Sequence, residues 1–399
     1  MSVDTAVILA GGEGSRLRPL TKNRPKPLLP AANRPIIEYV LDSIIEVGIT
    51  DVHLVVGYER ERVQSHLGAS YRNVDLTYHI QEKQLGSGHA LLQARGAIDE
   101  PFLVVNGDQL SEPSIAADVI DAYETKHPDA AIGAIESDTA SEYGVLEITD
   151  GVVTSLVERP GTDHAGLLNT GIYVFPPAVF DVLAEIPRLD GTLPLPAAVS
   201  ELIDRTGTTV AGVLTDGFWT DATYPWDLLT VADQVFRMEW IDMPEHEPHV
   251  WVADSATIHP SAELQAPAVV GPDSEVGPGA VVGPTVALGG NSTVAANAVV
   301  TNAVIDDGSR VGPNTTAIDA VIGQDVTFGP GGTIVGGHHD VRIDDRVYSD
   351  RRLGAAVADR TTLGGAVSVR GGVLIGNAVE VADGVHVTQN LANGVEVQR

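Results

Sequence analysis

Cysteine is absent from this chain of 399 residues, and lysine stands at only four positions. The lack of cysteine excludes disulfide bonds, thiolate catalysis and cysteine-ligated zinc. No run of about eighteen apolar residues is present that would cross a membrane, and an acid lies near the start where a secretory signal would carry basic residues. We therefore expect a soluble, cytoplasmic protein. With 43% hydrophobic residues, the chain is long and apolar enough for two folded domains.

Basic residues are scarce: 54 acidic residues face 24 basic ones, which gives a net charge of −30. A diffuse negative field repels anionic substrates, so a pressure other than substrate binding must have set this charge. Many carboxylates with few lysines are typical of proteins that stay soluble in concentrated salt, where the Debye length shrinks to a few ångströms. The composition predicts a halophilic source, with an ordinary acidic enzyme as the alternative. It disfavours nucleic-acid binding, which requires a basic patch.

The first 240 residues alternate short apolar runs with helix-length amphipathic stretches. This alternation predicts an α/β domain with a mostly parallel sheet covered on both faces. The expected helices include 35–47 and 114–125. The expected strands are 6–9, 52–56, 76–80, 102–105, 131–135 and 172–175.

From Thr257 onward, an aliphatic residue recurs at every sixth position. The unbroken series comprises Ile258, Leu264, Val270, Val276, Val282, Leu288, Val294 and Val300. The same step returns over 322–334 and over 357–387. A strict period of six predicts a parallel β-helix with triangular coils, in which each side is one hexapeptide. The alternative, a β-sandwich of short strands, does not require such a period.

Two segments depart from these patterns. Residues 240–249 are polar and contain proline, so we place a linker at 241–256, between domains at 1–240 and 257–399. Residues 335–356 interrupt the repeat and predict an inserted loop.

The sharpest local pattern opens the chain. An apolar strand at 6–9 runs into the glycine-rich sequence 10–21, and Pro-Lys-Pro follows at 25–27. Glycines after a first strand let backbone N–H groups approach an anion. Leu17 stands where the dinucleotide fingerprint needs glycine, and the Gly-Lys-Ser/Thr of the P-loop is absent. An anion-binding loop followed by two cations, Arg16 and Lys26, remains.

This opening string resembles the signature of sugar-1-phosphate nucleotidylyltransferases, a family that includes glucose-1-phosphate thymidylyltransferases and N-acetylglucosamine-1-phosphate uridylyltransferases. The resemblance implies a Rossmann-like mixed-sheet α/β nucleotidyltransferase domain followed by a left-handed parallel β-helix. It also implies that the loop wraps a nucleoside triphosphate, that Arg16 neutralises the leaving pyrophosphate, and that Lys26 contacts the reacting phosphates. Fixed cations suit this chemistry, because two anions must be held in line.

Downstream, residues 81–90 resemble the base-reading segment of that family. Gln81 carries a donor and an acceptor, which suits the imide edge of uracil or thymine, so UTP and dTTP both remain open. Gly86 allows close approach to the base, and Ser87 can contact base or ribose. The predicted nucleotide-binding residues are Leu9, Ala10, Gly11, Gly12, Gly14, Ser15, Gln81, Gly86 and Ser87.

Two aspartates are the predicted metal ligands. Asp108 follows the strand at 102–105, and α/β sheets place their ligands at the carboxyl ends of strands. Asp221 lies in a Trp-Thr-Asp string at 219–221 that is similar to the second metal-binding segment of the family. Two carboxylates completed by substrate oxygens suit Mg²⁺. The sugar phosphate would then attack the α-phosphorus, with loop amides, Arg16 and Lys26 sharing the developing charge.

By the same resemblance, three further segments form the sugar pocket. Hydroxyl groups are recognised through hydrogen bonds, which carboxylate and amide side chains supply. One position departs from the pattern, because many relatives carry lysine where this chain has arginine at 159. The predicted sugar-binding residues are Tyr143, Gly144, Glu158, Arg159, Asn169 and Thr170.

Three interpretations are open for the β-helix: assembly into homo-oligomers such as trimers, regulation, or acetyl transfer to glucosamine 1-phosphate. Acetyl transfer needs a histidine base, and residues 357–364 lack the histidine that long relatives commonly carry there. His338, His339 and His386 are the available substitutes. A non-catalytic regulatory subunit is a further alternative for the whole chain, although such subunits are expected to lose the loop cations or the metal carboxylates.

Overall fold

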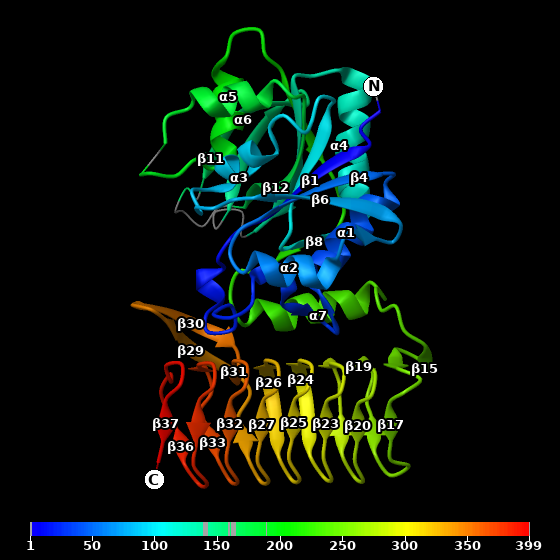
Figure 1. The fold of residues 1–399 in the computed structure, drawn as a ribbon, viewed down its shortest axis with the longest axis vertical. Coiled ribbons are helices and arrows are strands. Elements are labelled where there is room, and N and C mark those ends of the chain that lie inside the picture. The colour runs from blue at the N-terminus through cyan, green and yellow to red at the C-terminus, as the bar shows by residue number, and fades with distance from the viewer. Residues whose placement is uncertain (1, 139–142, 159, 161–164, 189, 399) are drawn as a thin grey trace. The chain divides into compact units, whose positions relative to one another are not determined.

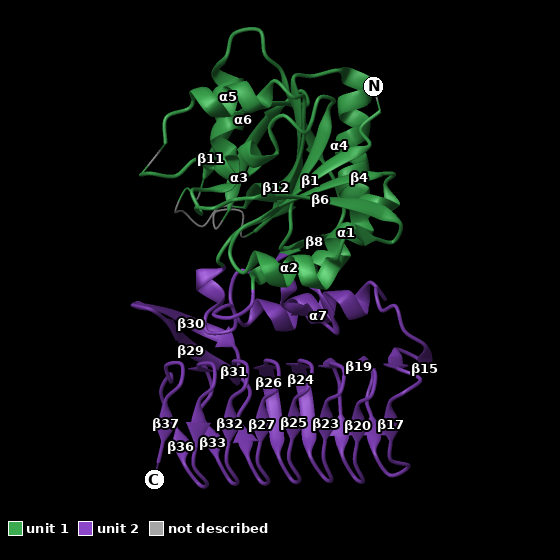
Figure 2. Cartoon of the chain, in the orientation of Figure 1, with its two compact units in different colours: residues 1–13, 25–27, 36–220 green, residues 14–24, 28–35, 221–399 purple. Residues whose placement is uncertain are grey.

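A computed structural model describes residues 2–138, 143–158, 160, 165–188 and 190–398 (Figure 1). The chain forms two compact units (Figure 2). The first comprises residues 1–13, 25–27 and 36–220, and the second comprises 14–24, 28–35 and 221–399. Part of the glycine-rich segment therefore belongs to the same unit as the C-terminal repeats.

The first unit is built on a ten-stranded mixed sheet in the order β10-β11-β13-β9-β12-β7-β1-β4-β6-β5. Strands β7, β1, β4 and β6 run parallel, whereas β12 is antiparallel to β7 and β9. The strand predictions and the mixed-sheet α/β class are confirmed. The mostly parallel sheet predicted from the alternation of elements is wrong, because β10, β11 and β12 join their neighbours by antiparallel pairing. In chain order the strands are β1 (Thr5–Ala10), β4 (Asp51–Val56), β5 (Ser70–Tyr71), β6 (Val74–Ile80), β7 (Phe102–Asn106), β9 (Ala130–Ser137), β10 (Gly144–Thr149), β11 (Val152–Glu158), β12 (Gly166–Phe175) and β13 (Val210–Leu214).

Helices cover both faces of this sheet. In β9, Ile132 packs in the apolar cluster that includes α3, α5 and α6, and the next residue, Gly133, faces Ile115 and Val119 of α4. Successive side chains of a strand point to opposite faces, so these helices lie on opposite sides. Both predicted helices are confirmed as α1 and α4. The helices of this unit are α1 (Ile36–Glu46), α2 (Arg60–Leu67), α3 (Ser87–Leu91), α4 (Pro113–Lys126), α5 (Val179–Glu185) and α6 (Pro196–Asp204).

The second unit is a parallel β-helix whose coils pair along three faces. Val250, Ala268 and Val286 align along the first face, which shows that each early coil takes eighteen residues, or three hexapeptides. The first face holds β16 (Val250–Val252), β19 (Ala268–Val270), β22 (Val286–Leu288), the ends of β24 (Val299–Ile305) and β26 (Thr316–Ile322), β31 (Ala355–Val357) and β34 (Val373–Ile375). The second holds β17 (Thr257–Ile258), β20 (Glu275–Val276), β23 (Thr293–Val294), β25 (Arg310–Val311), β27 (Thr327–Phe328), β32 (Thr362–Leu363), β35 (Glu380–Val381) and β37 (Glu396–Val397). The third holds β18 (Glu263–Leu264), β21 (Val281–Val282), the starts of β24 and β26, β28 (Thr333–Ile334), β33 (Ser368–Val369) and β36 (His386–Val387).

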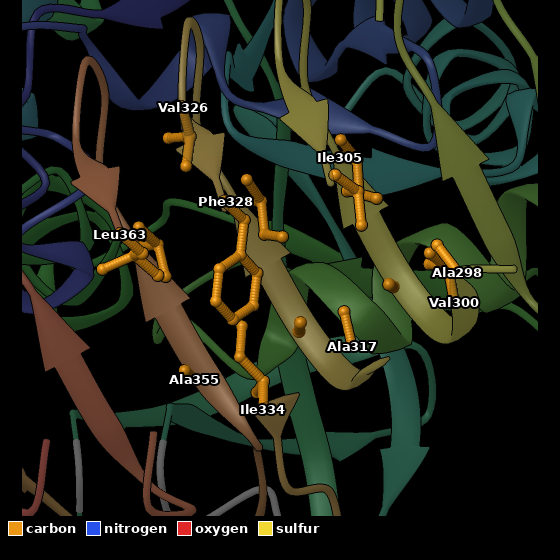
Figure 3. Close-up of a cluster of buried hydrophobic side chains, with 14 of the residues drawn as sticks. Ala298, Val300, Ile305, Ala317, Val326, Phe328, Ile334, Ala355 and Leu363 are labelled. Atoms are coloured by element: carbon orange, nitrogen blue, oxygen red, sulfur yellow. The ribbon is translucent and has the colours of Figure 1, made fainter. Parts of the chain in front are cut away.

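The residues of the six-residue series form the core of this helix (Figure 3). Val300 and Phe328 are almost fully buried, as predicted. The period breaks once after Val300, where a side of five residues leads to Ile305, and once more before Ile322. The shortened sides place Asp306, the next position of a strict series, beside the core position instead of in it.

One boundary and one element differ from the sequence interpretation. β16 already pairs with β19, so coiling begins at Val250 within the region assigned to a linker, where β15 (Glu245–Glu247) also pairs with β16. The insertion at 335–356 is a hairpin of β29 (His338–Ile343) and β30 (Arg346–Arg352) rather than a loop.

Helix α7 (Asp227–Arg237) packs on β24 and β26. In the described part of the chain, no helix is long and apolar enough to cross a membrane.

Candidate active site

The phosphate loop starts where parallel strands end. The buried strand β1 delivers Leu9 and Ala10, and the loop continues through Gly11 and Gly12. The backbone N–H of Gly107, just past β7, donates to the Leu9 carbonyl at 2.9 Å, and that of Tyr58, just past β4, donates to the Gly11 carbonyl at 3.3 Å. The loop is therefore fixed at the carboxyl edge of the sheet, where α/β proteins bind ligands.

The rest of the loop belongs to the second unit. Gly14 adopts a left-handed conformation with φ of 61°, and a short 3₁₀ helix, η1 (Ser15–Leu17), follows. The Thr21 hydroxyl donates to the Gly14 carbonyl at 2.8 Å. The Arg16 side chain is exposed, and its guanidinium carbon lies 5.6 Å from the ring centroid of Tyr224.

In the first unit, the Gln81 side chain lies against Gly11 of the loop. Its side chain is buried, and a Cβ on Gly11 would lie 2.6 Å from its Oε1, so only glycine fits there without displacing the amide. Its Nε2 donates to the Gly86 carbonyl and lies 3.1 Å from Nδ1 of His89, so the neutral imidazole can accept there. Among the described residues, no hydrogen bond reaches Oε1, which leaves an acceptor for a ligand.

The segment after Gln81 is held by residues 193–195, which the sequence did not single out. Gly86 has φ of 100°, and a Cβ there would lie 2.5 Å from the Leu193 carbonyl oxygen. The Leu195 N–H donates to the Ser87 hydroxyl at 2.8 Å, which fixes the start of α3. His89 was also missed, although it stands inside the predicted base-reading segment. Burial, with the nearby Arg188, lowers the pKa of His89 below the ordinary histidine value.

Lys26 and Asp108 meet in the first unit. The Lys26 ammonium lies 2.6 Å from the Asp108 carboxylate, and the Lys26 side chain is almost buried. The Asp108 side chain is 29% exposed and follows the end of a parallel strand, and carboxylate oxygens are ligands that hard divalent cations prefer. The donor set thus fits a magnesium ion that completes its shell with substrate oxygens. In the described part of the chain, no group of three or more His, Cys, Asp or Glu side chains forms a ready cation cage.

Asp221, the other predicted metal ligand, ends β14 (Trp219–Asp221). Its Oδ2 accepts from the Thr223 hydroxyl at 2.5 Å. Asp227 accepts from the backbone N–H groups of Thr223 and Tyr224, which fixes the turn before α7. Asp221 and Asp108 belong to different units, so a shared ion remains a prediction.

The predicted sugar residues lie together in the first unit. Gly144 of β10 stands opposite Glu158 of β11, and a Cβ on Gly144 would lie 3.4 Å from the Cβ of Asn169. Trp219, which the sequence analysis did not assign to the pocket, donates to the Thr170 carbonyl at 2.7 Å and packs edge-on against Tyr143 at 5.3 Å. Arg159 lies outside the described residues.

Tyr173 is a buried neighbour of these predicted sugar residues. Its hydroxyl accepts from the Asn169 amide at 2.9 Å. Burial, with the nearby Glu158 carboxylate, raises the pKa of Tyr173, so its hydroxyl stays protonated at neutral pH. The side-chain oxygen of Asn169, Oδ1, in turn accepts from the Gly171 N–H at 2.9 Å. The amide is therefore held in one orientation, as stereospecific recognition of hydroxyl groups requires.

A glycine loop at the carboxyl edge of a parallel sheet, with a buried amide and a lysine–aspartate pair, defines a nucleotide-binding α/β enzyme class. The chain belongs to the nucleotidyl transferase family, whose model matches residues 5–237. A second model, the GMPPB C-terminal domain, matches residues 246–351. The protein is a sugar-1-phosphate nucleotidyltransferase, a class that generally uses a divalent metal.

Some similar proteins match nearly the whole chain, and others match only part of it. A bifunctional protein GlmU of Methanococcus vannielii is 30% identical over 93% of this chain and 92% of its own length. A UTP–glucose-1-phosphate uridylyltransferase, AglF of Haloferax volcanii, is 37% identical over 44% of this chain and 73% of its own length. A solved putative glucose-1-phosphate thymidylyltransferase from Bacillus anthracis has a TM-score of 0.55 at 25% identity, covering 60% of this chain and 97% of that one.

Proposed function

We propose that the protein joins a sugar 1-phosphate to UTP or dTTP, releasing pyrophosphate. Gln81 carries this proposal, because its Oε1 is the available acceptor beside the phosphate loop and would receive the imide N–H of uracil or thymine. Adenine presents no such imide donor. Names of similar proteins, a uridylyltransferase and a putative thymidylyltransferase, support the pyrimidine assignment.

In this reaction, the chain itself orients and neutralises anions. The loop amides from Gly11 to Ser15 would hold the triphosphate, Lys26 the reacting phosphates, and Arg16 the leaving pyrophosphate. Glu158, Asn169 and the neighbouring sugar residues would orient the sugar phosphate oxygen toward the α-phosphorus. Mg²⁺ bound by Asp108 and Asp221 would supply Lewis-acid stabilisation of phosphate charge.

The test is a substrate matrix. Pyrophosphate release would be assayed in concentrated KCl with Mg²⁺, crossing five nucleoside triphosphates with glucose, glucosamine and N-acetylglucosamine 1-phosphates. Turnover with UTP or dTTP alone is expected, and Asp108→Ala should abolish it. Preferred turnover with ATP would contradict the role given to Gln81. Preferred turnover with GTP would contradict the pyrimidine assignment, because the N1–H of guanine can also donate to Oε1. No turnover of the folded protein with any substrate pair would contradict the activity.

A second activity is favoured by relatives that are named bifunctional and match this chain over 93% of its length. Acetyl transfer in the β-helix would require a base among the predicted substitutes. His386 lies 2.7 Å from the Ser368 hydroxyl, and His338 lies 3.2 Å from Asp350, whereas His339 lies 3.2 Å from the Gly336 carbonyl. Thiol release from acetyl-CoA with glucosamine 1-phosphate, lost in His386→Ala, would establish this activity.

For the β-helix itself, we propose a role in assembling copies of the chain, with a trimer as the expected state. Each of its three faces is a parallel ladder, and such helices commonly pack as trimers in related families. Light scattering in concentrated KCl should give three times the mass of one chain, and a monomer would contradict this role. The acidic composition further supports adaptation to concentrated salt.

A further inference from the structure

One corner of the β-helix carries two buried acidic side chains, Asp306 and Asp359. The corner follows the first face, where inward residues from Val270 to Ile375 align from coil to coil. The position after the inward residue is usually glycine. Two coils differ: Asp306 follows Ile305, and Ala358 follows Val357, with Asp359 as the next residue. The glycines at the equivalent corners are Gly271, Gly289, Gly323 and Gly376.

Both acids bind the same arginine of the N-terminal signature. Arg24, Asp306 and Asp359 are all buried. The Arg24 Nη1 donates to Asp306, and Nη2 donates to Asp359 at 3.2 Å. Asp359 also accepts from the Gln324 N–H at 2.9 Å, which ties the pair to the intervening coil. A planar guanidinium held by two carboxylates has a defined orientation, which a lysine would not share.

The same segment is held at further points by the second unit, to which residues 14–24 belong (Figure 2). The Asn377 amide, one coil beyond Asp359, donates to the Pro19 carbonyl at 3.0 Å. At the other end of the segment, Arg16 lies over Tyr224, whose ring packs 4.8 Å from that of Tyr348 on the hairpin. The segment that carries Arg16 is therefore fixed by residues of the β-helix and its insertion.

We propose that Asp306 and Asp359 are positioning residues for nucleotidyl transfer, which they support by fixing Arg24 and hence the segment that places Arg16. This inference rests on the proposed role of Arg16 at the leaving pyrophosphate. Displacement of a charged donor by about 1 Å costs on the order of 100-fold in rate. The β-helix thus contributes to the reaction without touching a substrate.

The test compares Asp306→Asn, Asp359→Asn, Arg24→Lys and Arg24→Gln in the full chain. Asp273→Asn is the matched control, because Asp273 is an exposed acid at the same corner of an earlier coil. Amide hydrogen exchange of residues 14–24 should accelerate at least about tenfold in the first four variants. The value of kcat should fall about 10- to 100-fold, with the KM for sugar 1-phosphate within about twofold of wild type. Arg24→Lys retains the charge and keeps the test open if Arg24→Gln does not fold.

Because the acids act through Arg24, a triple variant with Arg24→Gln, Asp306→Asn and Asp359→Asn should be no slower than Arg24→Gln alone. Unchanged exchange and kcat in both asparagine variants would overturn the proposal, as would independent losses that multiply in the triple variant. Arg16→Ala is measured alongside. Full activity in Arg16→Ala would overturn the proposed role of Arg16, whereas an impaired Arg16→Ala with normal asparagine variants would overturn only the positioning.

Discussion

At the scale of single residues, close approach decides which side chains the nucleotide site tolerates. A Cβ on Gly11 would meet Gln81 Oε1 at 2.6 Å, whereas one on Gly12 would have nothing within 4 Å. Steric crowding therefore requires glycine at position 11 but not at position 12. Gly11 makes room for the buried amide, and Gly12 leaves its backbone open to a ligand.

Gly11→Ala should lower the free energy of unfolding by about 1 to 3 kcal/mol, because the buried Gln81 amide must move and lose its hydrogen bonds. Chemical denaturation measures this loss. Gly12→Ala is the control, with an expected change within about 0.5 kcal/mol. Equal stability of the two variants would show that the amide rearranges at no cost.

His89 predicts a pH dependence. Because the folded-state pKa of His89 is lowered, its neutral form persists below the ordinary histidine value. The associated stability is fully present above that ordinary value and is lost as the pH falls through the folded-state pKa. Once protonated, Nδ1 no longer accepts from Gln81. The KM for the nucleotide should therefore rise several-fold as the pH falls through this lowered pKa, which lies below the ordinary histidine value of about 6.5.

His89→Asn provides the comparison, since an amide oxygen can replace Nδ1 as acceptor without titrating. The nucleotide KM of this variant should change less with pH than that of the wild type. Initial-rate measurements between about pH 5 and 8 decide the point. An identical acid limb in both proteins would assign the titration to the nucleotide or to another group.

At the scale of elements, the sequence predicted regular structure well and insertions poorly. The six-residue series identified the β-helix core because every inward position must be apolar to bury the coil interior. Val252 lies six residues before Ile258 and is a signal for the earlier start of the helix, but the polar, proline-containing segment 240–249 directly before this region led to its assignment to a linker. The hairpin at 338–352 has no such period, because its ladder is antiparallel and largely exposed.

The site shows the same division. The positions of Gln81 and Asp108 just past strand ends were predictable, because apolar runs in the sequence mark the strands β6 and β7. The hydrogen bond between Asn169 and Tyr173 forms within β12, where the register with β9 is irregular between the two residues. The ring contact of Trp219 with Tyr143 joins segments that are distant in the sequence. Neither a strand irregularity nor a long-range ring contact leaves a local sequence pattern, so these contacts could not be predicted.

The hairpin yields a prediction of its own. Tyr348 packs against Tyr224 at 4.8 Å and Trp226 at 5.5 Å, so Tyr348→Ala should lower the free energy of unfolding by about 1 to 3 kcal/mol. The neighbouring Val347 is 44% exposed, and Val347→Ala should change stability by less than about 0.5 kcal/mol. Denaturant titration compares them. Equal effects would show that the aromatic cluster contributes no more than exposed hairpin surface.

At the scale of the whole molecule, charge governs the conditions for folding. At a net charge of −30, the excess carboxylates repel one another, and added ions screen that repulsion. Raising KCl from about 0.2 to 2 M should increase the melting temperature by on the order of 10 °C. Differential scanning calorimetry measures the shift. Sucrose at matched osmolality is the control, and an equal gain in sucrose would attribute the effect to solute exclusion instead of screening.

The buried ion pairs of Arg24 have a consequence for synthesis of the chain. Arg24 leaves the ribosome early, but its two carboxylates follow 282 and 335 residues later. A nascent chain can form strand β1 and its neighbours long before these partners exist, since domains fold as their residues emerge. The Arg24 guanidinium therefore lacks Asp359 as a partner until about nine-tenths of the polypeptide has been synthesised. Translation order therefore makes completion of the signature segment one of the last events of biogenesis, which keeps an unfinished enzyme from acquiring its mature loop.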